Sequence, residues 1–480
     1  MNKSIVSYLL GWITIFVGTL MLLPLGVSLL YHETPIALCF ISTIAICLFL
    51  GGIFVFKKPQ NSKMYLREGF VITALSWIIM SIMGSLPFIF SGYIKNPIDA
   101  VFETASGFTT TGASILPAVE NLPYGLLFWR SFTHWVGGMG VLVFLLMIKP
   151  LSGASNVNLM KAESPGPQVE KLAPKLRTTA RILYSIYIAM TVIQIIFLLI
   201  GKMPVFDAVT TAFGTAGTGG FGIKNDSIAS YSPYLQNVVT IFMILFGVNF
   251  SFYFLSLQGK IKRAIVIEEV RWYFIIIISS ITIITLNTHG MFESISETIR
   301  HAAFQVGSII TTTGFATTDF NLWPQASKTI LVILMFVGAC AGSTGGGIKV
   351  SRLVILVKTF FKELKSMLHP QNLSKVKMDG KTVPHEIVRI TNVFFITYMV
   401  IFTASVFLIS FDNKDLVTNF TSVAATLNNI GPGLEMVGPT QNFGHFSNFS
   451  KIILIFDMLA GRLELFPMLL LFKKETWQKF

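Results

Sequence analysis

The chain has 480 residues, of which 53% are hydrophobic and only 12% are charged. A soluble protein carries about 25% charged residues, so this composition excludes an ordinary soluble enzyme or binding domain and indicates a polytopic membrane protein. The net charge of +13 could suggest nucleic acid, but the basic residues cluster between apolar runs, as the positive-inside rule predicts, and we expect no nucleic-acid partner.

The predicted elements begin with two apolar runs, at 6–30 and 36–56, which form an N-terminal transmembrane hairpin within residues 1–64. A unit then recurs four times: a span, a half-length helix, a glycine-centred loop and a second span. The spans have about the 20 residues that crossing a bilayer requires. The predicted fold class is an all-α integral membrane protein with four pseudo-repeated units around one central pore. The units occupy residues 65–150, 151–260, 261–365 and 366–480.

Each unit has its own predicted half-length helix and second span. The half-length helices are predicted at 97–108, 204–213, 295–310 and 415–427. The second spans are predicted at 126–148, 238–257, 329–358 and 451–472. The central glycines are Gly112, Gly220, Gly314 and Gly431, separated by 108, 94 and 117 residues. This spacing is typical of a repeat with insertions in its connections.

The glycine-centred loops are the candidate functional site. Irregular backbone at membrane depth survives only where it is buried or lines water, so four such loops predict the carbonyl-lined walls of one ion pore. Ordinary turns, which also favour glycine and threonine, are the alternative for any single loop. Each half-length helix would direct a C-terminal charge of about −0.5 towards the pore, which favours a cation. The candidate ligands are Thr110, Thr111, Gly112, Thr218, Gly219, Gly220, Thr312, Thr313, Gly314, Asn429, Ile430 and Gly431.

The distribution of basic residues predicts the orientation. About 27 of the 36 Lys and Arg residues, Lys3 included, lie in the connections after residues 56, 148, 257, 348 and 472. These connections are expected to be cytoplasmic. Both termini then lie in the cytoplasm of a multi-pass protein, and the glycine-centred loops open to the outside.

Two features interrupt the predicted spans. The stretch 338–347 is so rich in Gly and Ala that a regular helix is not expected, although a packing patch of small residues is an alternative. Arg462 lies within the last span, where a charge is expensive and indicates function. Neither Asp457 nor Glu464 has helical spacing for pairing with Arg462, so we expect its partner on another segment.

Three motifs carry a resemblance to a known family. They are Phe128–Gly140 (FWRSFTHWVGGMG), Ala341–Lys349 (AGSTGGGIK) and Ala460–Glu464 (AGRLE). With four glycines, one in each loop, the chain resembles the TrkH-type potassium-uptake subunits of the Trk/Ktr/HKT superfamily. The resemblance implies a potassium-selective pore in the bacterial inner membrane, with potassium as the transported ion and no other cofactor. It also implies a gate formed by Arg462 with Gly342, Ser343, Thr344, Gly345, Gly346 and Gly347.

The resemblance further implies partners. A TrkA-type cytoplasmic, nucleotide-binding regulatory subunit would dock on the basic face formed by Lys349, Arg352, Lys358 and the loop 358–389, together with the segment 150–180. Membrane lipid would explain the same positive charge equally well. A homodimer is the implied oligomeric state.

Two other functions compete with a conducting subunit. A membrane enzyme would need a nucleophile, base or metal cluster near mid-membrane, and neither the scattered histidines nor Cys39, Cys47 and Cys340 provide that spacing. We therefore expect no enzymatic activity. A proton- or sodium-coupled potassium symporter on the same fold stays open, because Asp457 and Glu464 are too few to decide it.

Overall fold

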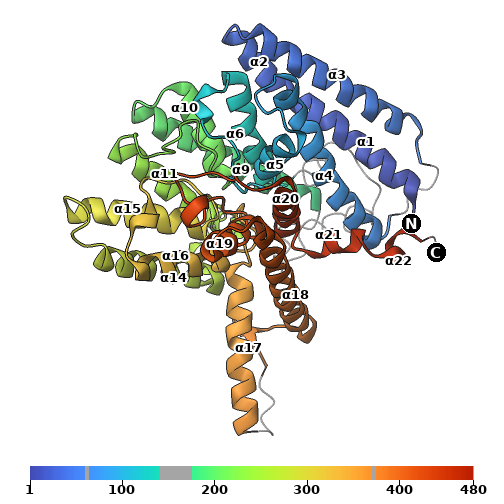
Figure 1. Cartoon of the computed structure of the whole chain (residues 1–480). Helices are drawn as coiled ribbons and strands as arrows, with labels where there is room; N and C mark the ends of the chain where they lie inside the picture. Colours follow the sequence, from blue (N-terminus) through green and yellow to red (C-terminus); the bar gives the residue numbers. More distant parts are fainter. Residues whose placement is uncertain (60–63, 141–175, 370–374, 479–480) are drawn as a thin grey trace.

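The structure is a computed structural model that describes residues 1–59, 64–140, 176–369 and 375–478, and helices dominate it (Figure 1). Within these ranges six helices are long and apolar enough to cross a membrane. A seventh span is counted if two helices joined by a 90° bend are taken together. The predicted helical, multi-pass membrane architecture is therefore confirmed.

The N-terminal hairpin forms as predicted. It consists of α1 (Lys3–Leu20), α2 (Leu22–Leu30) and α3 (Thr34–Phe56). Small residues bring its helices together, since a Cβ atom added to Gly51 would lie 2.8 Å from the carbonyl oxygen of Gly11. The Glu33 carboxylate accepts N–H bonds from Tyr124 (2.7 Å) and Gly125 (3.0 Å), which anchors the hairpin to the first turn of α6 (Tyr124–Gly138) in the next unit.

The four units follow in sequence order. The first contains α4 (Leu66–Phe90), α5 (Pro97–Phe108) and α6 (Tyr124–Gly138). The second contains α9 (Leu176–Ile200), α10 (Val205–Ala216), α11 (Pro233–Phe246), α12 (Phe250–Leu257) and α13 (Ile261–Val266). The third contains α14 (Glu268–Asn287), α15 (Ile295–Ile310), α16 (Gln325–Val337) and α17 (Val350–Leu368). The fourth contains α18 (His385–Ile409), α19 (Leu416–Leu427), α20 (Asn448–Arg462), α21 (Phe466–Leu471) and α22 (Lys474–Trp477).

The half-length helices match their predicted positions closely. The bounds of α5 and α15 coincide with the prediction, and α19 begins one residue later. Helix α10 continues three residues beyond the predicted end, because Gly214 packs inside the helix against Phe315 instead of opening the loop. The predicted unit boundary at 150 and the basic segment 150–175 lie outside the described residues.

The predicted second spans of the second and fourth units are not continuous helices, which corrects the sequence analysis; residues 141–148 of the first unit's span lie outside the described residues. The 238–257 span bends by 90° between α11 and α12, where Asn249 leaves the helix and caps α12 through Ser251 N–H (2.8 Å). The 451–472 span breaks after Arg462, because Glu464 and Leu465 adopt φ values of +56° and +70°. In the third unit, residues 338–349 form a non-helical loop, as predicted for this stretch.

The segment 358–389 is also not the single loop that the sequence suggested. Helix α17 continues to Leu368 and projects away from the rest of the molecule at the bottom of Figure 1. A short antiparallel hairpin follows, β1 (Lys377–Met378) and β2 (Lys381–Thr382), with an Asp-Gly turn in the left-handed conformation. The turn residue Asp379 accepts the N–H of Glu268 (2.6 Å) and so caps α14.

The two chain termini lie next to each other (Figure 1). The Met1 amino group donates to the carbonyl oxygen of Gln478 at 2.7 Å. Both termini are therefore on one side of the molecule.

Candidate functional site

The four short helices α5, α10, α15 and α19 end in the same way. In α5 the N–H of Thr110 bonds to the Gly107 carbonyl (3.1 Å) and that of Thr111 to the Ser106 carbonyl (2.9 Å), which is a Schellman C-cap. The other three helices repeat this pair of bonds, from Thr218 and Gly219, from Thr312 and Thr313, and from Asn429 and Ile430. The four short helices that precede the glycines thus share one pattern of terminal backbone hydrogen bonds.

Threonine occupies a strained position in three of these caps. Thr110, Thr218 and Thr312 have φ values of +56°, +53° and +58°, and Asn429 has +56°. A left-handed conformation is a genuine outlier for a β-branched residue and costs about 1–3 kcal/mol. Such strain persists where the surrounding structure dictates the backbone path, and it is concentrated at functional sites.

The four glycine loops, residues 109–112, 217–220, 311–314 and 428–431, close into one ring. A Cβ atom added to Gly112 would lie 2.0 Å from the carbonyl oxygen of Gly219. A Cβ atom added to Gly220 would lie 2.0 Å from the Thr313 carbonyl oxygen, and one added to Gly314 would lie 2.1 Å from the Ile430 carbonyl oxygen. A Cβ atom added to Gly431 would lie 2.7 Å from the Thr111 carbonyl oxygen, which completes the ring. Each glycine therefore packs directly against a carbonyl of the next loop, and a side chain at any of the four would displace backbone.

The segments that leave the ring are tied together in the same cyclic order. Val119 N–H donates to Asn225 Oδ1 (2.9 Å), and Ala316 N–H donates to Ser227 Oγ (3.2 Å). Glu435 N–H donates to Asn321 Oδ1 (3.0 Å), and Phe443 N–H donates to the Ser114 carbonyl (2.8 Å). These bonds join the first unit to the second, the second to the third, the third to the fourth and the fourth to the first.

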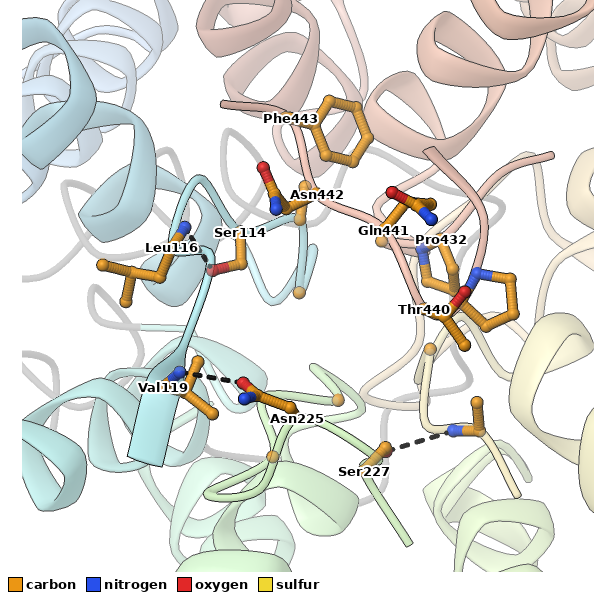
Figure 2. Close-up of a pocket in the computed structure, with 18 of the residues that line it drawn as sticks. Ser114, Leu116, Val119, Asn225, Ser227, Pro432, Thr440, Gln441, Asn442 and Phe443 are labelled. Atoms are coloured by element: carbon orange, nitrogen blue, oxygen red, sulfur yellow. Dashed lines mark hydrogen bonds between the residues drawn. The ribbon is translucent and has the colours of Figure 1, made fainter. Parts of the chain in front are cut away.

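A polar cavity of about 130 Å³ lies on this side of the ring, with all four glycines in its wall. Figure 2 shows its rim, where Ser114, Asn225, Ser227 and Asn442 lie around the opening. Among the described residues, the lining includes hydroxyl and amide groups and the basic side chains of Arg130 and Lys224, but no carboxylate. A hydrated ion could reach the ring through such a cavity without meeting an acidic side chain.

A buried ion pair lies beside the ring and supports it. Glu103 on α5 and Arg130 on α6 are 1% and 4% exposed and meet at 2.6 Å. Glu103 also accepts the N–H of Ile115 (2.9 Å), while Arg130 donates to the Gly222 carbonyl (2.8 Å). The pair therefore joins the segments that follow the first and second glycine loops.

Arg462 lies on the opposite side of the ring from the polar cavity. Its guanidinium donates to Thr110 Oγ1 (3.1 Å), to the Thr344 carbonyl (2.9 Å) and to the carbonyls of Gly137 and Gly138. The structure thus brings the predicted arginine into contact with both a glycine loop and the loop 338–349. As expected, its partners lie on other segments, because Glu464 pairs with Arg352 and Asp457 accepts from Ser405.

The loop 338–349 closes the same face. Gly346 N–H donates to Thr312 Oγ1 (2.6 Å), and a Cβ atom added to Gly346 would lie 2.6 Å from the Asn428 carbonyl oxygen. Lys349 reaches back to the Gly345 carbonyl. The residues predicted for the gate are therefore next to those predicted for the ion ligands.

Sequence reasoning missed the supporting residues. Three charged side chains lie nearly buried in apolar surroundings: Glu103, Arg130 and Glu269. A charge within an apolar stretch is the signal that could have identified them as functional candidates. Sequence reasoning also missed the pair between Asp99, in the first turn of α5, and Lys451 (2.7 Å). Among the described residues, no group of three His, Cys, Asp or Glu side chains could hold a metal ion.

A helical membrane protein with this ring of backbone carbonyls belongs among the cation transport proteins, and the comparisons agree. The sequence profile of the TrkH family, described as "Cation transport protein", matches residues 37–480. The chain belongs to the TrkH family.

Several relatives match over the full length. The "Trk system potassium uptake protein TrkH" of Salmonella typhimurium is 35% identical, with 100% of both chains covered. The protein of the same name from Escherichia coli K12 is also 35% identical, again over 100% of both chains. The crystal structure of "the Potassium Transporter TrkH from Vibrio parahaemolyticus" superposes with a TM-score of 0.89 at 31% identity and covers 100% of both chains.

The buried ion pair yields a stability prediction. Glu103→Gln leaves the Arg130 charge buried without its counterion, so we expect the free energy of unfolding to fall by about 3 kcal/mol. Glu297→Gln, which removes a more exposed pair with Arg300 (3.4 Å), should cost less than about 1 kcal/mol. Denaturant unfolding in detergent measures both, and equal losses would contradict the assigned role of Glu103.

Proposed function

We propose that the chain is the potassium-selective, ion-conducting subunit of a bacterial Trk-type potassium uptake system. The single observation that carries this proposal is the ring in which each of four glycines packs against a carbonyl of the next loop. A cation that sheds its water needs oxygen ligands, and backbone carbonyls can supply them where glycine allows the close approach. The names of the full-length relatives identify potassium as the ion.

The electrostatics of the ring favour a cation. Four helices, α5, α10, α15 and α19, end at the ring with their carbonyl ends, and each carries a partial charge of about −0.5 there. The twelve residues predicted as ligands supply this ring, and none of them is charged. On this proposal the protein forms a neutral, carbonyl-lined ion pore in the inner membrane, with both termini in the cytoplasm. The family resemblance further implies a homodimer.

One observation favours a coupled symporter as the second candidate. Asp457, on α20, is fully buried against α18, and its Oδ2 has no hydrogen-bond partner in the described part of the chain. Intramembrane carboxyl groups of this kind serve proton relays. Potassium flux that follows the potassium gradient alone, and is unchanged in Asp457→Asn, would exclude it.

The ring predicts the effect of a side chain on selectivity. Gly112→Ser should lower the preference for potassium over sodium about tenfold or more, because its Cβ would meet the Gly219 carbonyl at 2.0 Å and distort the ring. Gly290→Ser is the matched control, since Gly290 has a similar φ of +90° but no atom within 4 Å of the added Cβ. Ion flux in proteoliposomes under defined potassium and sodium gradients measures the ratio, and an unchanged ratio in folded Gly112→Ser would refute the assignment.

We further propose that Arg462 and the loop 338–349 form the closed gate. A fixed positive charge 3.1 Å from Thr110 Oγ1 lies next to the ring and repels a cation by roughly several kcal/mol at an effective dielectric near 20. The tip of the loop has little side-chain mass and can move aside to open the path. A regulator then needs only to bias two positions of this loop.

Removing the charge should open the path. Arg462→Ala should raise basal potassium flux about tenfold or more in the absence of any regulatory subunit. Arg271→Ala, at an exposed arginine of α14, should leave the flux unchanged. Potassium uptake per molecule of folded transporter is the measurement, and a flux that falls in Arg462→Ala while the folded yield holds counts against the gate.

We propose that the regulator is a TrkA-type cytoplasmic, nucleotide-binding subunit that docks on projecting helix α17, with membrane lipid as the competing ligand of its positive charge. Lys362→Glu with Lys365→Glu should weaken co-purification of such a subunit at least about tenfold at low salt, where charge contacts are strongest. Lys95→Glu with Lys202→Glu, at exposed sites outside α17, is the control. Recovery equal to that of the unaltered protein would assign these lysines to lipid.

A further inference from the structure

The intramembrane loop, residues 338–349, has a neck and a tip that are held by different contacts. At the neck, the N–H of Val350 donates to the Ala339 carbonyl (3.1 Å), which brings the two limbs of the loop together. At the tip, residues 343–346, the contacts run to Arg462 and Thr312. Gly342 and Gly347, with φ values of +69° and +74°, flank the tip, so the backbone can pivot at both of its ends.

One carboxylate binds both limbs of the neck. Glu269 Oε1 accepts the N–H of Ala341 (2.6 Å) from the first limb and the N–H of Ser351 (3.1 Å) from the second. The two donors are ten residues apart in the sequence, so this single oxygen bridges the start and the end of the loop. Hydrogen bonds to a charged acceptor are stronger than those between neutral groups, so this carboxylate holds both limbs firmly.

The same carboxylate connects the neck to the bend between α11 and α12. Glu269 Oε2 accepts from Asn249 Nδ2 (3.4 Å), and Asn249 caps α12. Backbone bonds run alongside, from Cys340 N–H to the Gly247 carbonyl (3.1 Å) and from Phe250 N–H to the Gly342 carbonyl (3.0 Å). The neck is therefore fastened to a neighbouring unit by these bonds, whereas the tip reaches the same bend through one long bond, from Thr344 Oγ1 to the Phe246 carbonyl (3.3 Å).

The burial of Glu269 shows that the connection is specific. Glu269 is only 3% exposed, and a buried carboxylate is unfavourable unless its oxygens accept hydrogen bonds. Here its bonds go to the backbone of the neck and to the residue that forms the bend. A role in general packing would not require a charged group at this place.

We propose that Glu269 is a positioning residue that holds the neck of the intramembrane loop stationary, so that only the tip moves when the path opens. This inference rests on the proposed gate. Without Glu269 the neck loses its side-chain anchor and is held only by the backbone bonds, so the tip is less firmly aligned with Arg462 and Thr312. The closed state is then less populated even though Arg462 is intact.

Basal potassium flux in proteoliposomes tests the inference in the full chain. Glu269→Ala removes both oxygens and should raise flux per folded molecule about tenfold, which corresponds to about 1.4 kcal/mol. Glu269→Gln keeps one uncharged oxygen and should give a smaller rise of about threefold, so the test survives if the alanine variant does not fold. Glu363→Gln, at an exposed glutamate on α17, should match the unaltered protein.

A second readout reports on the neck itself. Cys340 lies in the first limb and is fully buried, so it should react slowly with a maleimide in detergent. With Cys39 and Cys47 replaced by Ala, Glu269→Gln should increase the labelling rate of Cys340 about tenfold, and Glu363→Gln should not. A merely structural role would lower the folded yield and leave both readouts of the folded fraction unchanged.

The outcomes separate this inference from the gate proposal. If Arg462→Ala raises flux while folded Glu269→Gln changes neither flux nor Cys340 labelling, the positioning role is wrong and the gate stands. If the unaltered protein and Arg462→Ala both fail to conduct potassium, the gate and the role of Glu269 are overturned together. A rise in both readouts in Glu269→Gln supports the inference.

Discussion

Close contact between backbones at four glycines is the constraint on which the rest of the structure depends. Because Gly112, Gly220, Gly314 and Gly431 have no Cβ, each loop can approach the carbonyl of the next one, and four carbonyls come together in one ring. The left-handed threonines before these glycines are strained, so the ring persists only if the surroundings fix the backbone. The four Schellman caps and the cyclic bonds between units provide that support.

The two faces of the ring differ in symmetry. On the side of the polar cavity, every neighbouring pair of units is joined by a hydrogen bond, so the support is distributed around the whole ring. On the other face, the third unit contributes the intramembrane loop and the fourth contributes Arg462. In the proposed function, the fourfold face coordinates the ion, whereas the single charge and the single loop on the other face can be displaced without disturbing the ring. This division allows one face to remain rigid while the other changes.

Buried charges connect elements that the chain places far apart. Glu103 with Arg130 ties the first two units together behind the ring, Lys451 with Asp99 joins the fourth unit to the first, and Glu269 joins the second unit to the loop of the third. Such groups are expensive in a membrane protein interior unless every one is bonded. Their positions at the junctions between units indicate that they determine how the units fit together.

The sequence by itself determined the elements whose signals are local. Helices α5 and α15 occupy their predicted residues because proline, serine and the threonine-glycine ends specify where a helix starts and stops. The glycine spacing likewise identified the ligand candidates, and the family resemblance supplied the gate candidates; the structure brings the two sets together. Only the tertiary structure decided the cyclic order of the loops, the contact of Arg462 with Thr344, and the roles of Glu103 and Glu269. These contacts join residues far apart in the chain, which no local sequence pattern specifies. The same holds for the bend at Asn249, which bonds to Glu269, and for the break at Glu464, which pairs with Arg352.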